Sequence, residues 1–509
     1  MNLQNKIDEI RFQKIITFTF FTIIFISTLN NAYLSGDDFV SISGQIWRDV
    51  YIPSFSKTWI PNRVFDPFGQ ALFTYVLDFL YFPLNNIFGL SFFWVHKILS
   101  AVFFSSFLTV VYLYIVNFIN LYNDNKNDKA FLILVNISIA IGIASILPWQ
   151  NHTYIISYEV PAFLSFLLLV EIIKILYPRG VDAGTQKNQI LRPPSALFLV
   201  LIYVCVFSLE AYCLILALTF FSMVAFNFIN KLTKNRYPYI NSFRFLAERQ
   251  VISFYAICFI LLTMYCMFLI LNFSERIRTK GQILISGFQF SINSIIPSDN
   301  NWLLMFAKSH GIFIIGITCI YLLLFYVYKR LNIVFSFKHY FVNGPMLSIL
   351  IMTGISLSLA SFIIIACLSK FTSLNFFNFN IYPWGALFLP AKLYLILFFS
   401  FFAINLNSRI WPIKSFIALL IFILTTQYLM LFFSFYERNS NRALLVERAY
   451  NLTIQNPNKF AVIDTKIELH NIEGAKLPFP AYDSPSWLTF TFGKMLKKYY
   501  GIEEMPSYK

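Results

Sequence analysis

The chain has 509 residues, of which 58% are hydrophobic and only 12% are charged, whereas soluble domains are about 25% charged. This composition excludes an ordinary soluble globular protein and predicts a polytopic membrane protein. The 39 Lys and Arg exceed the 24 Asp and Glu by 15, which we attribute to cytoplasmic loops that follow the positive-inside rule rather than to nucleic-acid binding.

The first apolar segment, residues 15–34, is long enough to span a bilayer, which takes about 20 apolar residues. Lys6, Arg11 and Lys14 precede it, and these cations are expected to hold the N-terminus in the cytoplasm. No small-residue cleavage site follows the segment, so we expect a membrane anchor rather than a signal peptide. Ten further apolar segments predict spans at residues 98–118, 130–148, 161–177, 196–209, 211–229, 251–273, 312–328, 346–368, 386–405 and 415–433.

The apolar stretch 196–229 is either one long helix or a tight hairpin. Basic segments flank it on both sides and both should be cytoplasmic, so an even number of crossings is expected between them. A hairpin satisfies this condition and places Glu210 at the outer face. The same counting assigns the interrupted apolar stretch 71–90 to a juxtamembrane helix in the membrane interface. The predicted fold is all-α, with about eleven transmembrane helices, a cytoplasmic N-terminus and an outward C-terminus.

The predicted organisation is a transmembrane domain at residues 1–434 and a tail at residues 435–509. The domain includes a long outward first loop, residues 35–97, and a second large outward loop, residues 274–311. The tail carries charge throughout and contains a short strand-like run at residues 459–464. We expect a small α+β cap, since about 75 residues are too few for a large independent core.

The first outward loop holds the most informative residues. Asp37 and Asp38 lie at the membrane boundary, where adjacent carboxylates repel each other and lose hydration. Arg48, Trp59 and Arg63 follow them. A carboxylate there can accept a proton from a hydroxyl, arginines can hold a phosphate, and tryptophan suits both the headgroup belt and a sugar ring. These residues indicate a site for a lipid-phosphate substrate, and the alternative is a solvated loop that merely ends the span.

This layout, with the short motif Gly36-Asp37-Asp38-Phe39 directly after the first span, resembles the GT-C superfamily of polyprenyl-phosphate-dependent glycosyltransferases. The chain length, the long first loop and the outward tail are similar to those of the phage-type serotype-converting O-antigen glucosyltransferases, the Gtr group. The resemblance lies in the layout of the whole chain, and its motif is short.

The resemblance implies an enzyme of the bacterial inner membrane with a periplasmic active site. Glucose would pass from undecaprenyl-phosphate-glucose to a sugar hydroxyl of lipid-linked O-antigen, the acceptor in lipopolysaccharide assembly, with inversion at the anomeric carbon. The general base would be Asp37 or Asp38, between which the sequence does not choose. A small flippase and a polyprenyl-phosphate glucosyltransferase would act upstream.

Other outward charges are supporting candidates. Arg276, Arg278 and Lys280 open the second large loop and suit a phosphate, whereas Glu210 is either a second acidic group or a polar hairpin turn. Glu159 either lines the same cavity or caps the helix that begins near Pro161.

Two charged positions inside predicted spans have more ordinary explanations. Lys392 is expected to extend toward the outer interface or to face the lipid phosphate. Glu171 and Lys174, one helical turn apart, are expected to pair with each other.

No residue pattern predicts a cofactor. All six cysteines lie within apolar runs without CxxC spacing, and the five histidines show neither HxxxH nor HExxH spacing, so we expect no zinc site. The acidic pair of the first loop suits a divalent cation, but no dedicated ligand set accompanies it.

Two alternatives to the glucosyltransferase remain open at this point. The first is an O-antigen polymerase or another GT-C sugar transferase. The late outward loop 369–385 holds only Lys370, which disfavours a polymerase with an arginine-rich catalytic loop. The second is a transporter or flippase, which would place charged residues near the bilayer midplane, where this chain has few.

Overall fold

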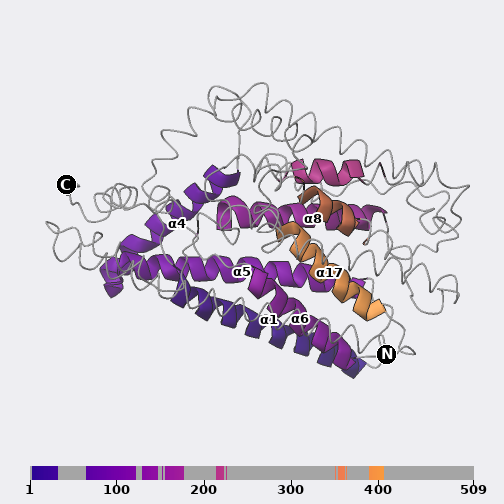
Figure 1. Ribbon diagram of the computed structural model, residues 1–509. Coiled ribbons are helices and arrows are strands. Elements are labelled where there is room, and N and C mark those ends of the chain that lie inside the picture. Colours follow the sequence, from indigo (N-terminus) through magenta and orange to yellow (C-terminus); the bar gives the residue numbers. More distant parts are fainter. Residues whose placement is uncertain are drawn as a thin grey trace, which may run out of the picture. The chain divides into compact units, whose positions relative to one another are not determined.

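The computed structural model describes residues 3–32, 65–121, 129–146, 152, 155–176, 212, 214–222, 225, 350, 353–361, 363 and 389–405. Its elements are the helices α1 (Leu3–Asn31), α4 (Phe65–Phe88), α5 (Phe92–Leu121), α6 (Lys129–Ile146), the π-helix η2 (Ile155–Glu159), α8 (Val160–Leu176) and α17 (Leu389–Asn405) (Figure 1). The prediction of an all-α fold is confirmed for these residues.

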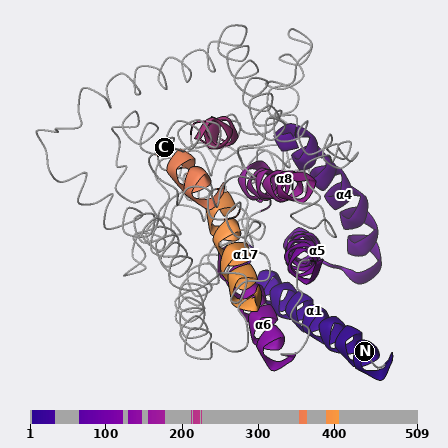
Figure 2. The same ribbon diagram turned by 90° about the vertical axis from the view of Figure 1, so that its right-hand side faces the viewer.

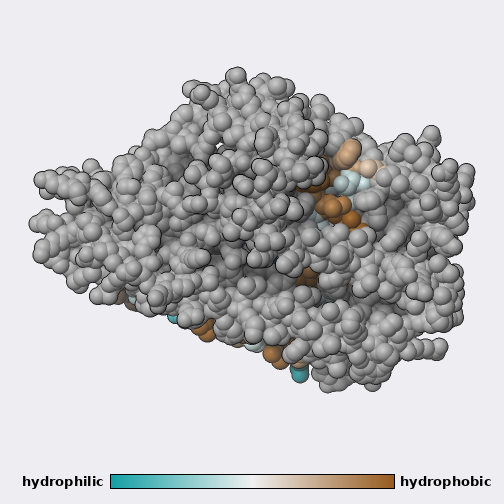
Figure 3. Space-filling view, viewed as in Figure 1, coloured by the Kyte–Doolittle hydropathy of each residue, from teal (hydrophilic) through white to brown (hydrophobic). Residues whose placement is uncertain are grey.

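Two of the described helices are long and apolar enough to cross a membrane: the part Arg11–Asn31 of α1 and all of α5. The 30 residues of α5 extend about 45 Å, against a hydrocarbon thickness of about 30 Å. Large apolar side chains of α1 are exposed, and brown side chains reach the surface along the lower edge of Figure 3, where α1 runs in Figure 1. These exposed residues of α1 are Phe12, Ile15, Phe18, Ile23 and Ile26.

Helices occupy the predicted segments that the structure describes. α6, α8 and α17 begin or end within three residues of the spans predicted at 130–148, 161–177 and 386–405. Residues 214–222 and 353–361 are helical within two further predicted segments. The total of eleven spans, the hairpin turn within 196–229 and the tail 435–509 depend on residues outside the described part.

A short turn joins α4 to α5 and explains why α5 begins at Phe92, six residues before the predicted span. Gly89 follows the last residue of α4 with φ 63°, a left-handed conformation that glycine adopts without a steric cost, and its N–H donates to the carbonyl of Asn85 at 2.8 Å. Ser91 then caps α5, since its Oγ accepts from the N–H of Trp94 at 3.5 Å. The cap lets the helix begin at Phe92, so α5 includes the polar residues His96 and Lys97 that interrupt the apolar sequence before the predicted span.

α4 presents apolar residues on two opposite faces, each with the helical spacing of three and four residues. The exposed face carries Leu72, Tyr75, Phe79 and Phe82. The buried face carries Phe73, Leu77 and Tyr81, with the polar Gln70 before them on the same face. A helix that is apolar toward both the protein and its surroundings suits the position in the membrane interface that the sequence predicts for residues 71–90.

The chain divides into two compact units. In the first unit, α1 packs along α5, with the rings of Phe20 and Tyr112 5.3 Å apart. Figure 2 looks nearly along α5 and shows α1 and α4 on different sides of it. In the second unit, Tyr394 of α17 donates from its hydroxyl to the carbonyl of Leu350 at 3.0 Å, which ties α17 to that part of the chain.

Candidate functional site

The residues that the sequence predicts as catalytic or substrate-binding lie outside the part of the chain that the structure describes. They are Asp37, Asp38, Arg48, Trp59, Arg63, Glu210, Arg276, Arg278 and Lys280. Their roles therefore stay predictions. The described residues instead bring together a polar cluster that sequence spacing did not indicate, at the contact between α4, the start of α5 and η2.

Two histidines form the centre of this cluster. His96 lies in the second turn of α5, and its Nε2 is 3.1 Å from Nδ1 of His152, 56 residues further along the chain. Both side chains are completely buried. Ser100, one turn after His96 on α5, places its Oγ 3.4 Å from the same Nε2.

The bond between the two imidazoles fixes how many protons the pair can hold. One proton must lie between His96 Nε2 and His152 Nδ1, because one ring donates and the other accepts. The pair can take up one further proton on an outer nitrogen and keep this bond, whereas a second would place two protons between the rings. His152 lies between α6 and α8, outside both predicted spans, and burial lowers its pKa, which favours the neutral pair.

An aromatic ring of α4 holds the histidine pair in place. Phe73 stacks on His152 with a centroid distance of 4.3 Å and an interplanar angle of 6°. The same ring meets His96 edge to face at 5.9 Å. Because the phenyl ring contacts both imidazoles, their relative orientation depends on how α4 packs.

α4 reaches this position through a close approach to η2. A Cβ on Gly69 would lie 2.6 Å from Cγ2 of Ile156, closer than two carbon atoms pack unless one of the groups shifts. Glycine at position 69 therefore lets α4 and η2 touch. The contact seats Phe73, one turn further along α4, on the histidine pair.

Glu159 ends the π-helical turn and is the most unusual residue of the cluster. Only 1% of its surface is exposed, and neither carboxylate oxygen has a hydrogen-bond partner among the described residues. The expectation that this carboxylate caps the following helix is therefore wrong, because a cap would accept a bond from a backbone N–H. Burial raises the pKa of Glu159, so the folded chain favours its neutral, protonated form.

Glu159 is the last residue of the π-helical turn η2. A single π-turn widens the helix and breaks the regular bonding pattern, and such turns are frequent at functional sites. Here η2 runs directly into α8, so Glu159 lies where the regular helix begins. A buried carboxyl group that has no hydrogen-bond partner among the described residues is suited to bond a hydroxyl group of a bound molecule.

Metal binding receives no support within the described ranges, where no three His, Cys, Asp or Glu side chains lie together. The histidine pair alone provides two ligands, whereas zinc sites use at least three protein ligands.

The two charged positions predicted inside spans are both described. Glu171 and Lys174 form the predicted pair, with Lys174 Nζ donating to Glu171 Oε1 at 2.7 Å, so this prediction is confirmed. Lys392 lies in the first turn of α17 and is half-buried. Its expected extension toward the outer interface stays a prediction.

A scan against protein-family models and searches of curated proteins and of solved structures gave no match for this chain.

Proposed function

We propose that the chain is a multi-pass inner-membrane glycosyltransferase that transfers glucose from undecaprenyl-phosphate-glucose to a hydroxyl group of O-antigen at the periplasmic face. The observation that carries this proposal is Glu159, a buried carboxyl group without a hydrogen-bond partner among the described residues. A sugar offers several hydroxyl donors, and a buried acceptor of this kind gains most from such a ligand.

The predicted topology puts the polar cluster and the acidic pair on one side of the membrane. With a cytoplasmic N-terminus, α1 ends outward, α5 begins outward, and the connection from α6 to α8 is outward. His96, His152 and Glu159 then share the outer side with Asp37 and Asp38 of the first loop. About eleven spans and an outward C-terminus complete this proposed arrangement.

The transfer step needs one base and a stabilised leaving group. The acceptor hydroxyl oxygen attacks the anomeric carbon as a carboxylate, Asp37 or Asp38, takes its proton. The bond between this carbon and the phosphate oxygen breaks, and its electron pair leaves with the phosphate. Arg276 and Arg278 are proposed to bind this phosphate, which is negatively charged before and after the transfer. Arg48, Arg63 and Lys280 add positive charge, Trp59 suits stacking on the sugar ring, and Glu210 supplements the acidic groups.

Glu159 takes a different role from the base in this scheme. Its raised pKa favours the protonated form, which both donates and accepts a hydrogen bond. It is therefore proposed to orient a sugar hydroxyl. The pair of His96 and His152 is proposed to keep α5 and the segment before η2 together, and it can take up one further proton.

The test is composition and linkage analysis of O-antigen from a smooth strain that expresses the gene with its upstream partners. The unmodified chain should add a side-branch hexose. Asp37→Asn with Asp38→Asn should abolish it, Glu159→Leu should reduce it about 10-fold or more because the sugar hydroxyl loses its partner, and Arg276→Ala with Arg278→Ala should weaken donor binding more than turnover. Glu171→Leu is the matched control, since it alters a carboxyl group of the continuing helix that has Lys174 as a partner.

The alternatives give different results in the same analysis. A changed O-antigen chain length without a new hexose indicates a polymerase. Retention of the hexose in all of these variants contradicts the proposed site.

The buried ionisable groups also favour a second candidate, a proton-coupled transporter or flippase. Intramembrane or buried acidic and histidine side chains mark proton relays in such proteins, and His96, His152 and Glu159 are all buried. Proteoliposomes with an imposed pH gradient test this function. Gradient-dependent movement of a lipid-linked sugar, lost in Glu159→Gln, would replace the glycosyltransferase proposal.

A further inference from the structure

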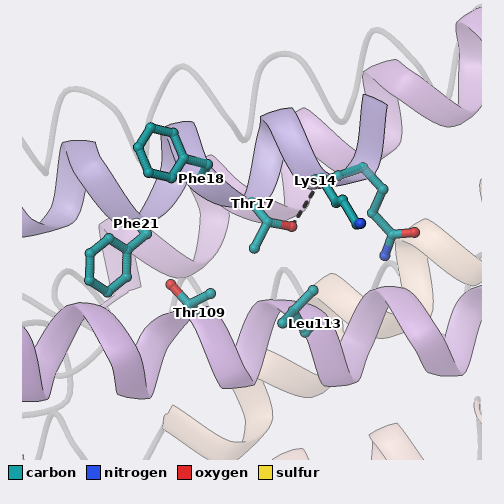
Figure 4. Close-up of a pocket in the computed structure, with 7 residues that line it drawn as sticks. Lys14, Thr17, Phe18, Phe21, Thr109 and Leu113 are labelled. Carbon is teal, nitrogen blue, oxygen red and sulfur yellow. Dashed lines mark hydrogen bonds between the residues drawn. The ribbon is translucent and has the colours of Figure 1, made fainter. Parts of the chain in front are cut away.

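A groove lies between α1 and α5 in the first unit, away from the polar cluster. Its volume is about 500 Å³. On α1 the lining residues Lys14, Thr17, Phe18 and Phe21 follow the spacing of one helix face. Figure 4 shows side chains of α5 pointing from the opposite wall toward α1.

The walls of the groove are mainly apolar. Phe18 and Phe21 contribute rings from α1, and Leu113 contributes its side chain from α5. The hydroxyl of Thr17 donates to the carbonyl of Gln13 at 2.8 Å, so it is already satisfied within α1 (Figure 4). A hydrocarbon chain suits such walls, because it leaves no polar group of its own unpaired.

One end of the groove is positively charged. Lys14 lines it, and Arg11 lies one helical turn earlier on the same helix. Both side chains are exposed, at the predicted cytoplasmic start of the first span. Lysine and arginine at the cytoplasmic end of a span attract the anionic headgroups of the cytoplasmic leaflet. Arginine can also bind a phosphate through two parallel hydrogen bonds.

We propose that this groove binds one anionic glycerophospholipid of the membrane, with an acyl chain between α1 and α5 and the headgroup phosphate on Lys14 and Arg11. The apolar walls and the cationic end together match the two parts of such a lipid. The site requires α1 and α5 to be embedded in a bilayer, as their length and composition indicate. It does not depend on the proposed glycosyl transfer.

The test uses photocrosslinking at single positions in the full-length chain. Phe18 lines the groove, and Ile15 is exposed on α1 without lining it, so each is replaced separately by p-benzoylphenylalanine. The chain is reconstituted in vesicles of equal phosphatidylglycerol and phosphatidylcholine, and mass spectrometry identifies the crosslinked lipid. Position 18 should capture phosphatidylglycerol with a several-fold enrichment over the bulk ratio, and position 15 should report the bulk ratio.

Charge variants then show whether the headgroup contact is the cause. Lys14→Gln should remove the enrichment at position 18, and the charge-preserving Lys14→Arg should keep it. An equal lipid ratio at positions 15 and 18, no lipid adduct at position 18, or an enrichment that survives Lys14→Gln with Arg11→Gln overturns the proposal. Competition by soluble glycerol phosphate, without any lipid adduct, would also overturn it in favour of a free-phosphate site.

Discussion

The imidazole nitrogens of His96 and His152 are 3.1 Å apart although 56 residues separate them in the chain. This bond connects the start of α5 with the segment that leads into η2, and the stacked ring of Phe73 adds α4 to the same contact. Three separate stretches of the first unit therefore meet at one buried hydrogen bond. Protonation of the two histidines should therefore change the free energy of unfolding of the protein.

Acidification should destabilise the chain through His152. Burial lowers the folded-state pKa of His152 below the ordinary value of 6.5, so the unfolded chain binds more protons as the pH falls through that value. Its contribution to stability is present above pH 6.5 and is lost below it, by up to about 1.4 kcal/mol per pH unit for one proton. Thermal unfolding in detergent between pH 4 and 8 measures the slope.

His152→Asn should flatten this acid slope, because an amide can replace Nδ1 in the bond to His96 without titrating in this range. Ser100→Ala is the control, since it leaves the imidazole pair in place. An unchanged slope in His152→Asn would assign the pH dependence to other groups.

Raising the pH should destabilise the chain through Glu159. Its folded-state pKa is raised above 4.5, so the unfolded chain releases this proton first. The stabilising contribution is complete below pH 4.5 and is lost as the pH rises toward the folded value, again at up to about 1.4 kcal/mol per pH unit. Glu159→Gln should remove that loss and raise the melting temperature at pH 8, whereas Glu171→Gln should not. Equal melting curves for wild type and Glu159→Gln across the range would contradict this prediction.

Gly69→Ala should destabilise the packing of α4 on η2 by about 1–3 kcal/mol, because the new Cβ overlaps the Ile156 side chain. Ile156→Ala removes the overlapping atom, so the double variant should lose less stability than the sum of the single changes. Gly89→Ala provides the comparison. It acts through its positive φ, and its cost should simply add to that of Ile156→Ala. A double-mutant cycle of unfolding free energies measures both couplings.

Breaking the ion pair of α8 should destabilise the second unit. Glu171→Gln or Lys174→Gln removes the ion pair at 2.7 Å, at a cost of about 1–3 kcal/mol. Exchanging the two residues, Glu171→Lys with Lys174→Glu, should recover part of the loss, because the three-residue spacing keeps the charges adjacent. Full additivity of the two single changes in melting experiments would show that the pair contributes no coupling energy.

The sequence predicted the parts of this structure that depend on nearby residues. The lengths of apolar runs located α6, α8 and α17, and the three-residue spacing identified the pair of Glu171 and Lys174. Both signals are local, since helix hydrogen bonds and one-turn side-chain contacts join residues close in the chain.

The polar cluster gave no such signal. Spacing rules for histidine pairs apply within one helix, whereas His96 and His152 meet between different segments. Glu159 is buried at the end of the π-turn η2, and no residue pattern predicted that turn. Gly69 is compatible with close packing, but a glycine in the sequence does not show which residue packs against it.

The seating of α4 sets an order of events during synthesis. Phe73 leaves the ribosome about 80 residues before His152, which at about 5–20 residues per second is a delay of roughly 4–16 s. During that time the inner face of α4 lacks the ring that it later stacks on. Membrane lipid can shelter both apolar faces of α4 until the η2 segment arrives. The exposed apolar face of α4 can therefore contact lipid before the protein partner of the other face has been made.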